Sequence, residues 1–241
     1  MRDLATVWDA LSSSPLLWLT VTLITYRAAE AAYDRLGFAW LNPVLISIVI
    51  VVATLLVTQT SYEDYFAGVQ LIHLLLGPAT VALAVPLYHR IERLRQMTGP
   101  IVGALLVGSC VAVGSAVAIG WLLGASPATL LSLAPKSVTT PIAMGVSEKI
   151  GGLPSLTAVL VILTGIVGAI TAEPVLNLLR VEDHSIRGFA VGVAAHGIGT
   201  ARAFQMDDEA GAFSGLGMGL NGILTAVLVP IFVDLVRFAG G

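Results

Sequence analysis

The sequence predicts an all-α polytopic membrane protein built from two inverted structural repeats with broken or re-entrant helices. Hydrophobic residues make up 56% of the 241 residues and charged residues only 11%, and the mean hydropathy is +0.91. Soluble domains carry about a quarter charged residues, so this composition indicates a protein that lies in a membrane. A repeated motif and the placement of the charges predict the repeats and their inversion.

Eight apolar segments follow one another, each long enough to cross about 30 Å of hydrocarbon. They are Pro15–Tyr33, Pro43–Thr60, Phe66–Tyr88, Gly99–Gly124, Ala128–Val146, Pro154–Leu179, Ile186–Phe204 and Gly211–Val236. The linkers are short and carry nearly all the charge, which leaves no room for a separate soluble domain. The residues before Pro15 carry two acids and one arginine and do not resemble a signal peptide, so we expect the first segment to direct insertion.

One motif occurs twice. Leu16–Gly37 reads LLWLTVTLITYRAAEAAYDRLG and Leu130–Gly151 reads LLSLAPKSVTTPIAMGVSEKIG, and an ungapped alignment pairs identical leucines, one threonine, one alanine and the final glycine. A weaker match sets Gly68, Gly77 and Thr80 against Gly188, Gly197 and Thr200. Related halves are typical of secondary transporters. We therefore divide the chain into a first repeat, 1–124, and a second repeat, 125–241.

The charges favour inversion of the second repeat. If the cluster Arg90, Arg93 and Arg95 is cytoplasmic, eight simple crossings place the 180–187 arginines outside, against the positive-inside rule. Inverted halves place Arg35, the cluster, Arg180, Arg187 and Arg237 inside. They place Glu63-Asp64 and Asp207–Glu209 outside, with Lys149 as the exception. Inversion requires an odd number of crossings in each half, so one segment in each half is expected to be re-entrant.

Four stretches carry glycine, proline and hydroxyl residues where a lipid-facing helix would carry leucine and valine. They are 77–80 (with Pro86), 134–141, 196–202 and 215–222. Proline removes one N–H and frees backbone carbonyls, which in lipid must be surrounded by protein or water. We expect helix breaks at Gly77, Pro78, Pro135 and Pro141, whose half-helix N-termini would attract a carboxylate. For 215–222, close helix packing is the alternative.

The candidate site consists of the polar residues in or near these stretches. Candidates for substrate binding are Lys136, Ser137, Thr139, Thr140, Thr80, Gly197, Gly199, Thr200, Arg202 and Asn221. Candidates for ion or proton coupling are Glu173 and His196.

Each ionisable candidate has an alternative explanation. Lysine at a helix centre costs roughly 2.5–3.5 kcal/mol, so Lys136 either binds substrate or reaches to the membrane interface. Arg202 either binds a carboxylate with its guanidinium or anchors the end of its segment. Glu173 either pairs with a buried cation or carries a coupling proton, and His196 either carries a proton or packs. The sequence contains no metal-ligand spacing, nucleotide loop, nucleophilic triad or long basic run. We therefore expect no metal, no cofactor, no enzyme activity and no nucleic-acid partner.

Three motifs resemble the LrgB/CidB family of bacterial inner-membrane proteins, and the resemblance covers nearly the whole chain. They are LLGPATVALAVPLY (Leu75–Tyr88), LAPKSVTTPIAMGVSEKIGG (Leu133–Gly152) and AAHGIGTARAF (Ala194–Phe204). The resemblance implies a multi-pass protein of the bacterial inner (cytoplasmic) membrane. It also implies an architecture similar to that of cation/proton antiporters and bile-acid-type symporters.

The resemblance implies two functions. One is a carrier of a small monocarboxylate of the pyruvate, glycolate, glycerate or lactate type. The other is a holin- or antiholin-like regulator of murein hydrolase activity and autolysis, acting with a small LrgA/CidA-type membrane subunit. The few cations and hydroxyls of the broken segments match a single carboxylate and not a polyanion. Two inverted halves around one site predict a carrier that works by alternating access. We also expect a homodimer in the lipid bilayer.

Overall fold

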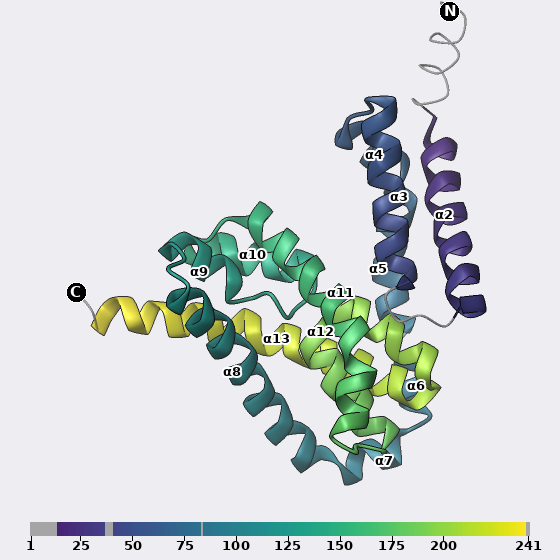
Figure 1. Ribbon diagram of the computed structural model, residues 1–241. Helices are drawn as coiled ribbons and strands as arrows, with labels where there is room; N and C mark the ends of the chain where they lie inside the picture. Colours follow the sequence, from purple (N-terminus) through teal and green to yellow (C-terminus); the bar gives the residue numbers. More distant parts are fainter. Residues whose placement is uncertain (1–13, 37–40, 83, 240–241) are drawn as a thin grey trace, which may run out of the picture. The chain divides into compact units, whose positions relative to one another are not determined.

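The computed structural model describes residues 14–36, 41–82 and 84–239, and every regular element in those ranges is a helix (Figure 1). The chain divides into two compact units, Met1–Ala82 and Leu83–Gly241. The all-helical prediction is therefore confirmed for the described residues. The unit boundary differs from the repeat boundary predicted at 124/125, which rests on sequence matches and stays a prediction.

The first unit contains α2 (Pro15–Leu36), α3 (Pro43–Thr58), α4 (Tyr62–Gly68) and α5 (Gln70–Ala82). Trp18 is buried and meets the ring of Tyr65 edge-on, with ring centroids 5.8 Å apart. The Tyr65 hydroxyl also lies 3.1 Å from that of Thr22. A ring contact and a hydrogen bond of Tyr65 therefore join α4 to α2.

The break expected at Gly77 and Pro78 is not present, because α5 continues through both residues. A proline inside a helix removes one hydrogen bond, and the turns on either side can remain helical. The two copies of the repeated motif also differ in backbone structure. Residues 16–36 lie in one continuous helix, α2, whereas the matching residues 130–151 form two helices with an interruption between them. Similar sequence in these stretches does not produce similar backbone.

The second unit begins with the short helices α6 (Ala84–Tyr88) and α7 (Ile91–Gln96). It continues with α8 (Thr98–Leu122), α9 (Pro127–Leu133), α10 (Thr140–Ile150), α11 (Pro154–Leu178), α12 (His184–Met206) and α13 (Asp208–Ala239). Among the described helices, three are long and apolar enough to cross a membrane: α8, α11 and residues 208–234 of α13. The other apolar segments of this unit are interrupted, as described next.

The first interruption makes α9 and α10 a hairpin. The chain leaves the helix after Leu133 and re-enters it at Thr140, an interval that contains Pro135. The end of α10 returns to the side of α9, because the backbone N–H of Leu153 donates to Ser132 Oγ at 2.8 Å. The Thr157 hydroxyl lies 3.1 Å from the Ser132 carbonyl oxygen. Residues 134–139 therefore form the tip of a first hairpin.

The second interruption lies inside α12, where the backbone of His196 has φ 43° and ψ −136°. A Cβ placed on Gly199 would lie 3.1 Å from the carbonyl oxygen of Val191. In a straight helix these residues, eight positions apart, would be separated by about 12 Å. The chain therefore reverses at His196, giving a second hairpin with an inward arm (184–195) and a return arm (197–206).

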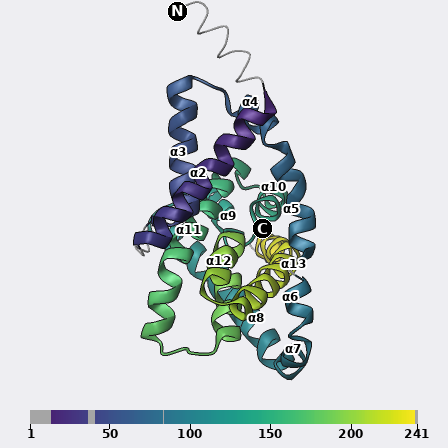
Figure 2. The same cartoon turned by 90° about the vertical axis from the view of Figure 1, so that its right-hand side faces the viewer.

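The inward arm packs against α13 at backbone contact (Figure 2). A Cβ on Gly188 or Gly192 would lie 2.0 Å from the carbonyl oxygen of Ala210 or Ser214, respectively, so only glycine fits. The paired residue numbers increase together, so the inward arm and α13 run in the same direction. Such close approach through small residues is a common way for helices to associate in membranes.

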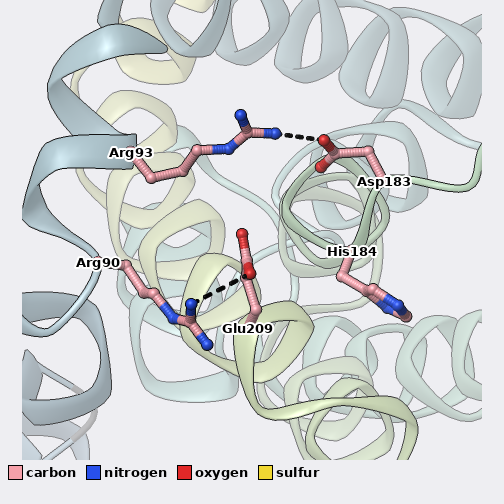
Figure 3. Close-up of a pocket in the computed structure, with 5 residues that line it drawn as sticks. All are labelled: Arg90, Arg93, Asp183, His184 and Glu209. Carbon is pink, nitrogen blue, oxygen red and sulfur yellow. Dashed lines mark hydrogen bonds and ion pairs between the residues drawn. The ribbon is translucent and has the colours of Figure 1, made fainter.

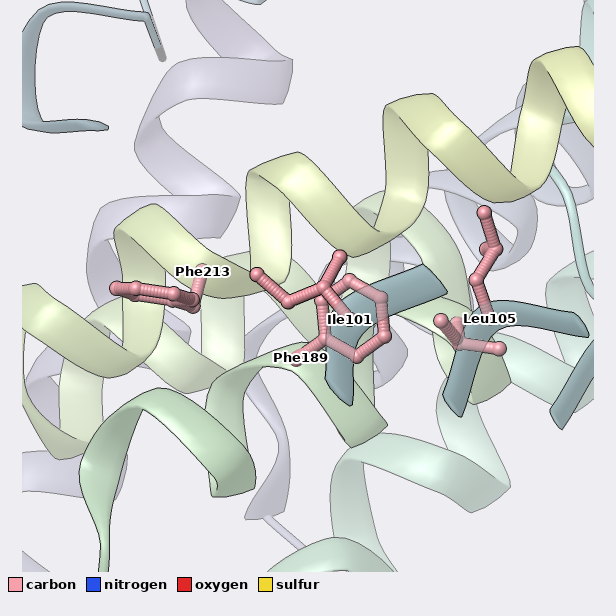
Figure 4. Close-up of a cluster of buried hydrophobic side chains, with 5 residues drawn as sticks. Ile101, Leu105, Phe189 and Phe213 are labelled. Atoms are coloured by element: carbon pink, nitrogen blue, oxygen red, sulfur yellow. The ribbon is translucent and has the colours of Figure 1, made fainter. Parts of the chain in front are cut away.

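Two of the apolar clusters of this unit show how the hairpins pack on α13. Side chains of α8, α12 and α13 meet in the first cluster, which includes Ile101, Leu105, Phe189 and Phe213 (Figure 4). In the second cluster Val229 of α13 contacts buried residues of the first hairpin and its tip, Ala134, Val146 and Ile150. The two clusters lie near opposite ends of α13. The first hairpin thus enters from one end of the unit and the second hairpin from the other.

Ion pairs join the base of the second hairpin to the arginine cluster. Arg93 pairs with Asp183 at the start of α12, and Arg90 lies 3.6 Å from Glu209 at the start of α13 (Figure 3). With His184 these residues line a pocket of about 370 Å³.

This geometry corrects part of the predicted charge placement. The 180–187 linker lies at the same end as the Arg90 cluster, as expected, but Asp207–Glu209 also lies there, although it was predicted on the opposite side. The reason is the reversal at His196, which returns the chain to the end where α12 began. Because α13 then runs away from that end, the position of Arg237 at its far end is also opposite to the prediction.

The arrangement predicts a specific pattern of chemical accessibility. Cys110 is the only cysteine, so a Cys110→Ala chain accepts single reporter cysteines. We expect Arg95→Cys, Glu182→Cys and Asp208→Cys to react with a membrane-impermeant maleimide from one side of a vesicle, and Lys149→Cys from the other. Reaction of Asp208→Cys from the side of Lys149→Cys would show that α12 crosses without reversing.

The base of the second hairpin should respond to acid through Asp183. The Ser185 hydroxyl, the N–H of Ile186 and Arg93 hold the pKa of the Asp183 carboxyl below its usual range. A lowered pKa stabilises the fold above the ordinary carboxyl pKa, and this contribution disappears as the pH falls through the lowered value. In thermal unfolding we expect Asp183→Asn to lower the Tm at neutral pH and to flatten its acid dependence. Glu182→Gln should behave like the parent, and an unchanged acid dependence in Asp183→Asn would contradict the assignment.

Candidate functional site

The two hairpin tips meet beside one side chain of α13, Asn221. This residue is 1% exposed. Its amide nitrogen donates to the carbonyl oxygen of Ser137 in the first tip, at 3.2 Å, and to that of Val193, one turn before His196, at 3.0 Å. The 134–139 tip, the end of the inward arm and the middle of α13 are thus within hydrogen-bonding reach of one another.

The acceptor side of Asn221 is also occupied. Ser109 of α8 donates to Asn221 Oδ1 at 2.6 Å, and Thr225 donates to the same atom at 3.4 Å. Sequence reasoning missed both hydroxyls. Thr225 could have been identified from its spacing, since it lies four residues after Asn221 and therefore on the same helix face. Ser109 had a weaker one, as a small polar residue in the apolar run of α8.

Lys136 brings a positive charge to the first tip. Its Nζ donates to Ser137 Oγ at 3.1 Å, and the residue is half-buried. Among the described residues no carboxylate lies within 4.0 Å of this ammonium. Its neighbour Ser137 shares the Asn221 amide with Val193, which lies three residues before His196. The structure therefore brings Lys136 and His196 together, although they are 60 positions apart in the sequence.

Polar groups without internal partners surround this charge. The hydroxyls of Thr139 and Thr140 are half-buried, and neither bonds another group in the part of the chain that the structure describes. Thr140 opens α10, and Gly197 opens the return arm, where an added Cβ would meet only Met218 Sδ at 3.8 Å. Both helix starts present N–H groups and a positive dipole end. One cation, two hydroxyls and two helix N-termini favour a small anion.

His196 holds the second tip in a conformation that L-residues rarely adopt. Its Nε2 lies 2.9 Å from the Val161 carbonyl oxygen of α11, and a carbonyl oxygen only accepts, so Nε2 carries the hydrogen. The Thr200 hydroxyl donates to the His196 carbonyl at 2.9 Å and accepts from Ser214. A positive φ at a non-glycine residue costs about 1–3 kcal/mol, so the surrounding contacts must hold His196 in this conformation.

Other predicted residues have different surroundings. Arg202 bonds Glu173 Oε2 at 2.6 Å and Gln205 Oε1 at 3.2 Å, so the substrate candidate and the coupling candidate form an ion pair with each other. Gly199 lies between the two arms of the second hairpin, and Thr200 is buried by its internal bonds. Thr80 belongs to the first unit, and its side chain lies outside the described structure.

The groups at the junction of the two tips are suited to binding an anion. In the described residues no group of three or more His, Cys, Asp or Glu side chains is placed to hold a metal ion. Lys136 is the charged residue nearest the tips, and the remaining groups there are hydroxyls, amides and backbone N–H groups. They are suited to binding one compact anion between the hairpins.

Comparisons with known proteins identify the family. The chain is 38% identical to YwbG of Bacillus subtilis, called an uncharacterized protein, over 216 residues that cover 90% of this chain and 96% of the relative. It is 31% identical to the holin-like protein CidB of Staphylococcus aureus over 220 residues, covering 91% and 96%. No solved structure matches. The sequence profile of the LrgB-like family matches residues 22–235, and the chain therefore belongs to that family.

Proposed function

We propose that this protein is a secondary transporter of a small monocarboxylate in the bacterial inner membrane, working by alternating access. The observation that carries the proposal is Lys136: a half-buried ammonium with no carboxylate partner among the described residues, at the meeting point of two hairpin tips. A charge in this position is expensive in a membrane unless a ligand or water compensates it.

The groups around Lys136 limit the substrate class. The ammonium can bind one carboxylate, and the free hydroxyls of Thr139 and Thr140 can bind a neighbouring keto or hydroxyl oxygen. This pattern fits pyruvate, glycolate, glycerate or lactate. Arg202, on the return arm of the second hairpin, is already paired with Glu173. It is therefore not available as a second cation that could bind a dianion.

The hairpins support alternating access. The first enters from the Lys149 end of the second unit and the second from the Arg90 end, so each closes the junction from one side. Broken helices around a central site are the usual construction of secondary transporters. Glu173 and His196 remain our candidates for proton coupling, Glu173 through its ion pair with Arg202 and His196 at the second tip.

A second candidate function is favoured by one comparison. CidB of Staphylococcus aureus is named a holin-like protein, and the similarity covers nearly both chains. In this function the protein would regulate murein hydrolase activity together with a small LrgA/CidA-type membrane subunit. A holin-like lesion passes solutes of many sizes without saturation, whereas a carrier saturates and shows counterflow.

One reconstitution experiment separates the two functions. Purified protein in proteoliposomes, with and without a proton gradient and the small subunit, is tested for uptake of labelled pyruvate, glycolate and lactate. We expect saturable uptake with counterflow of one of them and retention of a large neutral dye. Unsaturable leakage of that dye would refute the carrier and support the holin-like function.

Removing the charge of Lys136 should weaken substrate binding without unfolding the protein. A hydrogen bond to a charged group contributes roughly 1.5–3 kcal/mol, so Lys136→Ala should raise the KM for uptake by about one to two orders of magnitude. The matched control is Lys149→Ala, an exposed lysine at the far end of α10. Uptake by Lys136→Ala equal to that of the control would assign Lys136 to the membrane interface instead.

A further inference from the structure

We propose that Asn221 is a positioning residue that ties the tips of both hairpins together, so that they move as one body and not as two independent gates. Its amide nitrogen binds a carbonyl of each hairpin, and its oxygen binds hydroxyls of α8 and α13. The proposal concerns which parts of the protein move together and does not depend on which solute is moved.

The hydrogen-bonding capacity of Asn221 is fully used inside the protein. A primary amide has two donor hydrogens and two acceptor lone pairs, and all four positions have partners here. A residue that binds substrate needs at least one group free to do so. Although the sequence pattern suggested Asn221 as a substrate ligand, the structure favours an internal connection.

The two hairpins contact α13 in different ways. The second hairpin is already fixed to α13, because Gly188 and Gly192 bring the inward arm to backbone contact. Where α13 faces the first hairpin, a Cβ on Gly222 would meet only the end of the Ile142 side chain, at 3.0 Å, and Ala134 of the tip packs with Val229. The bond from Asn221 to the Ser137 carbonyl adds a polar link between α13 and the first tip. Asn221 is 1% exposed, so bulk water does not replace a partner that its amide loses.

The test measures the reactivity of each tip separately. In the Cys110→Ala chain, Thr139→Cys reports on the first tip and Gly197→Cys on the second. Both positions are half-buried, and Gly197 has room for a side chain and a φ outside the left-handed region. A third reporter, Leu179→Cys, lies in an exposed position near the base of the second hairpin. Each reporter is combined with Asn221→Leu, Asn221→Asp or Thr225→Val, and its maleimide reaction rate is measured.

We expect Asn221→Leu and Asn221→Asp to raise the rates at both tips about five- to tenfold, the factor that corresponds to loss of roughly one net hydrogen bond. The rate at Leu179→Cys should stay constant. Thr225→Val keeps both donations to the tips and should leave all three rates unchanged. At low pH, protonation of the Asn221→Asp side chain returns one O–H donor, so the tip rates, normalised to the Leu179→Cys rate, should fall part of the way back.

The outcomes that overturn the proposal are distinct. A rise at only one tip means that the hairpins open independently, and no rise at either means that Asn221 does not connect them. If Asn221→Leu does not fold, the Asn221→Asp series, which keeps the oxygen that Ser109 and Thr225 bind, decides the question. The measurement needs no transported solute, so a failure of the carrier proposal in uptake assays would leave this result unaffected.

Discussion

The second unit depends on hydrogen bonding of its backbone at two places where the chain reverses inside an apolar surrounding. A reversal exposes carbonyl and N–H groups that cannot be left unpaired in hydrocarbon. The Asn221 amide donates to the carbonyls of Ser137 and Val193, and the Thr200 hydroxyl donates to the carbonyl of His196. Ser109 and Thr225 in turn donate to Asn221 Oδ1 and hold that amide in place. The polar residues of α8 and α13 therefore make the two hairpins compatible with a membrane, and the hairpins in turn create the junction around Lys136.

The charged groups of this unit that contact the hairpins near their bases and tips differ in their partners. Arg90, Arg93, Asp183 and Glu209 pair at one end, where they join the base of a hairpin to the preceding helices. Arg202 and Glu173 pair between the return arm and α11. Lys136 is different, because its hydrogen bond is to the neutral hydroxyl of Ser137. Paired charges fix the position of a segment, whereas a charge without a counter-ion can bind a solute.

Much of this arrangement could be predicted from the sequence, because proline spacing and hydroxyl content are local signals. Pro135 lies in the observed first tip and Pro141 in the first turn of α10 directly after it, and the long apolar runs correspond to α8, α11 and α13. The reversal at His196 has no proline, and it depends on Val161, Thr200 and α13, which only the tertiary structure brings together. For the same reason the positions of Asp207–Glu209 and Arg237 were predicted wrongly. The opposite error occurs at Gly77 and Pro78. Their sequence predicts a helix break, but α5 continues through both residues.

The depth of the two tips has an energetic consequence. The return segments, α10 with 11 residues and 197–206, are each about 15 Å long at 1.5 Å per residue, half the thickness of the hydrocarbon core. In the membrane orientation proposed above, an anion at Lys136 lies near the bilayer midplane, where the membrane voltage acts on it. One elementary charge crossing the full potential changes in energy by about 2.3 kcal/mol per 100 mV. The voltage of a living cell would thus bias the direction in which a monoanion leaves the junction, even without a coupling ion.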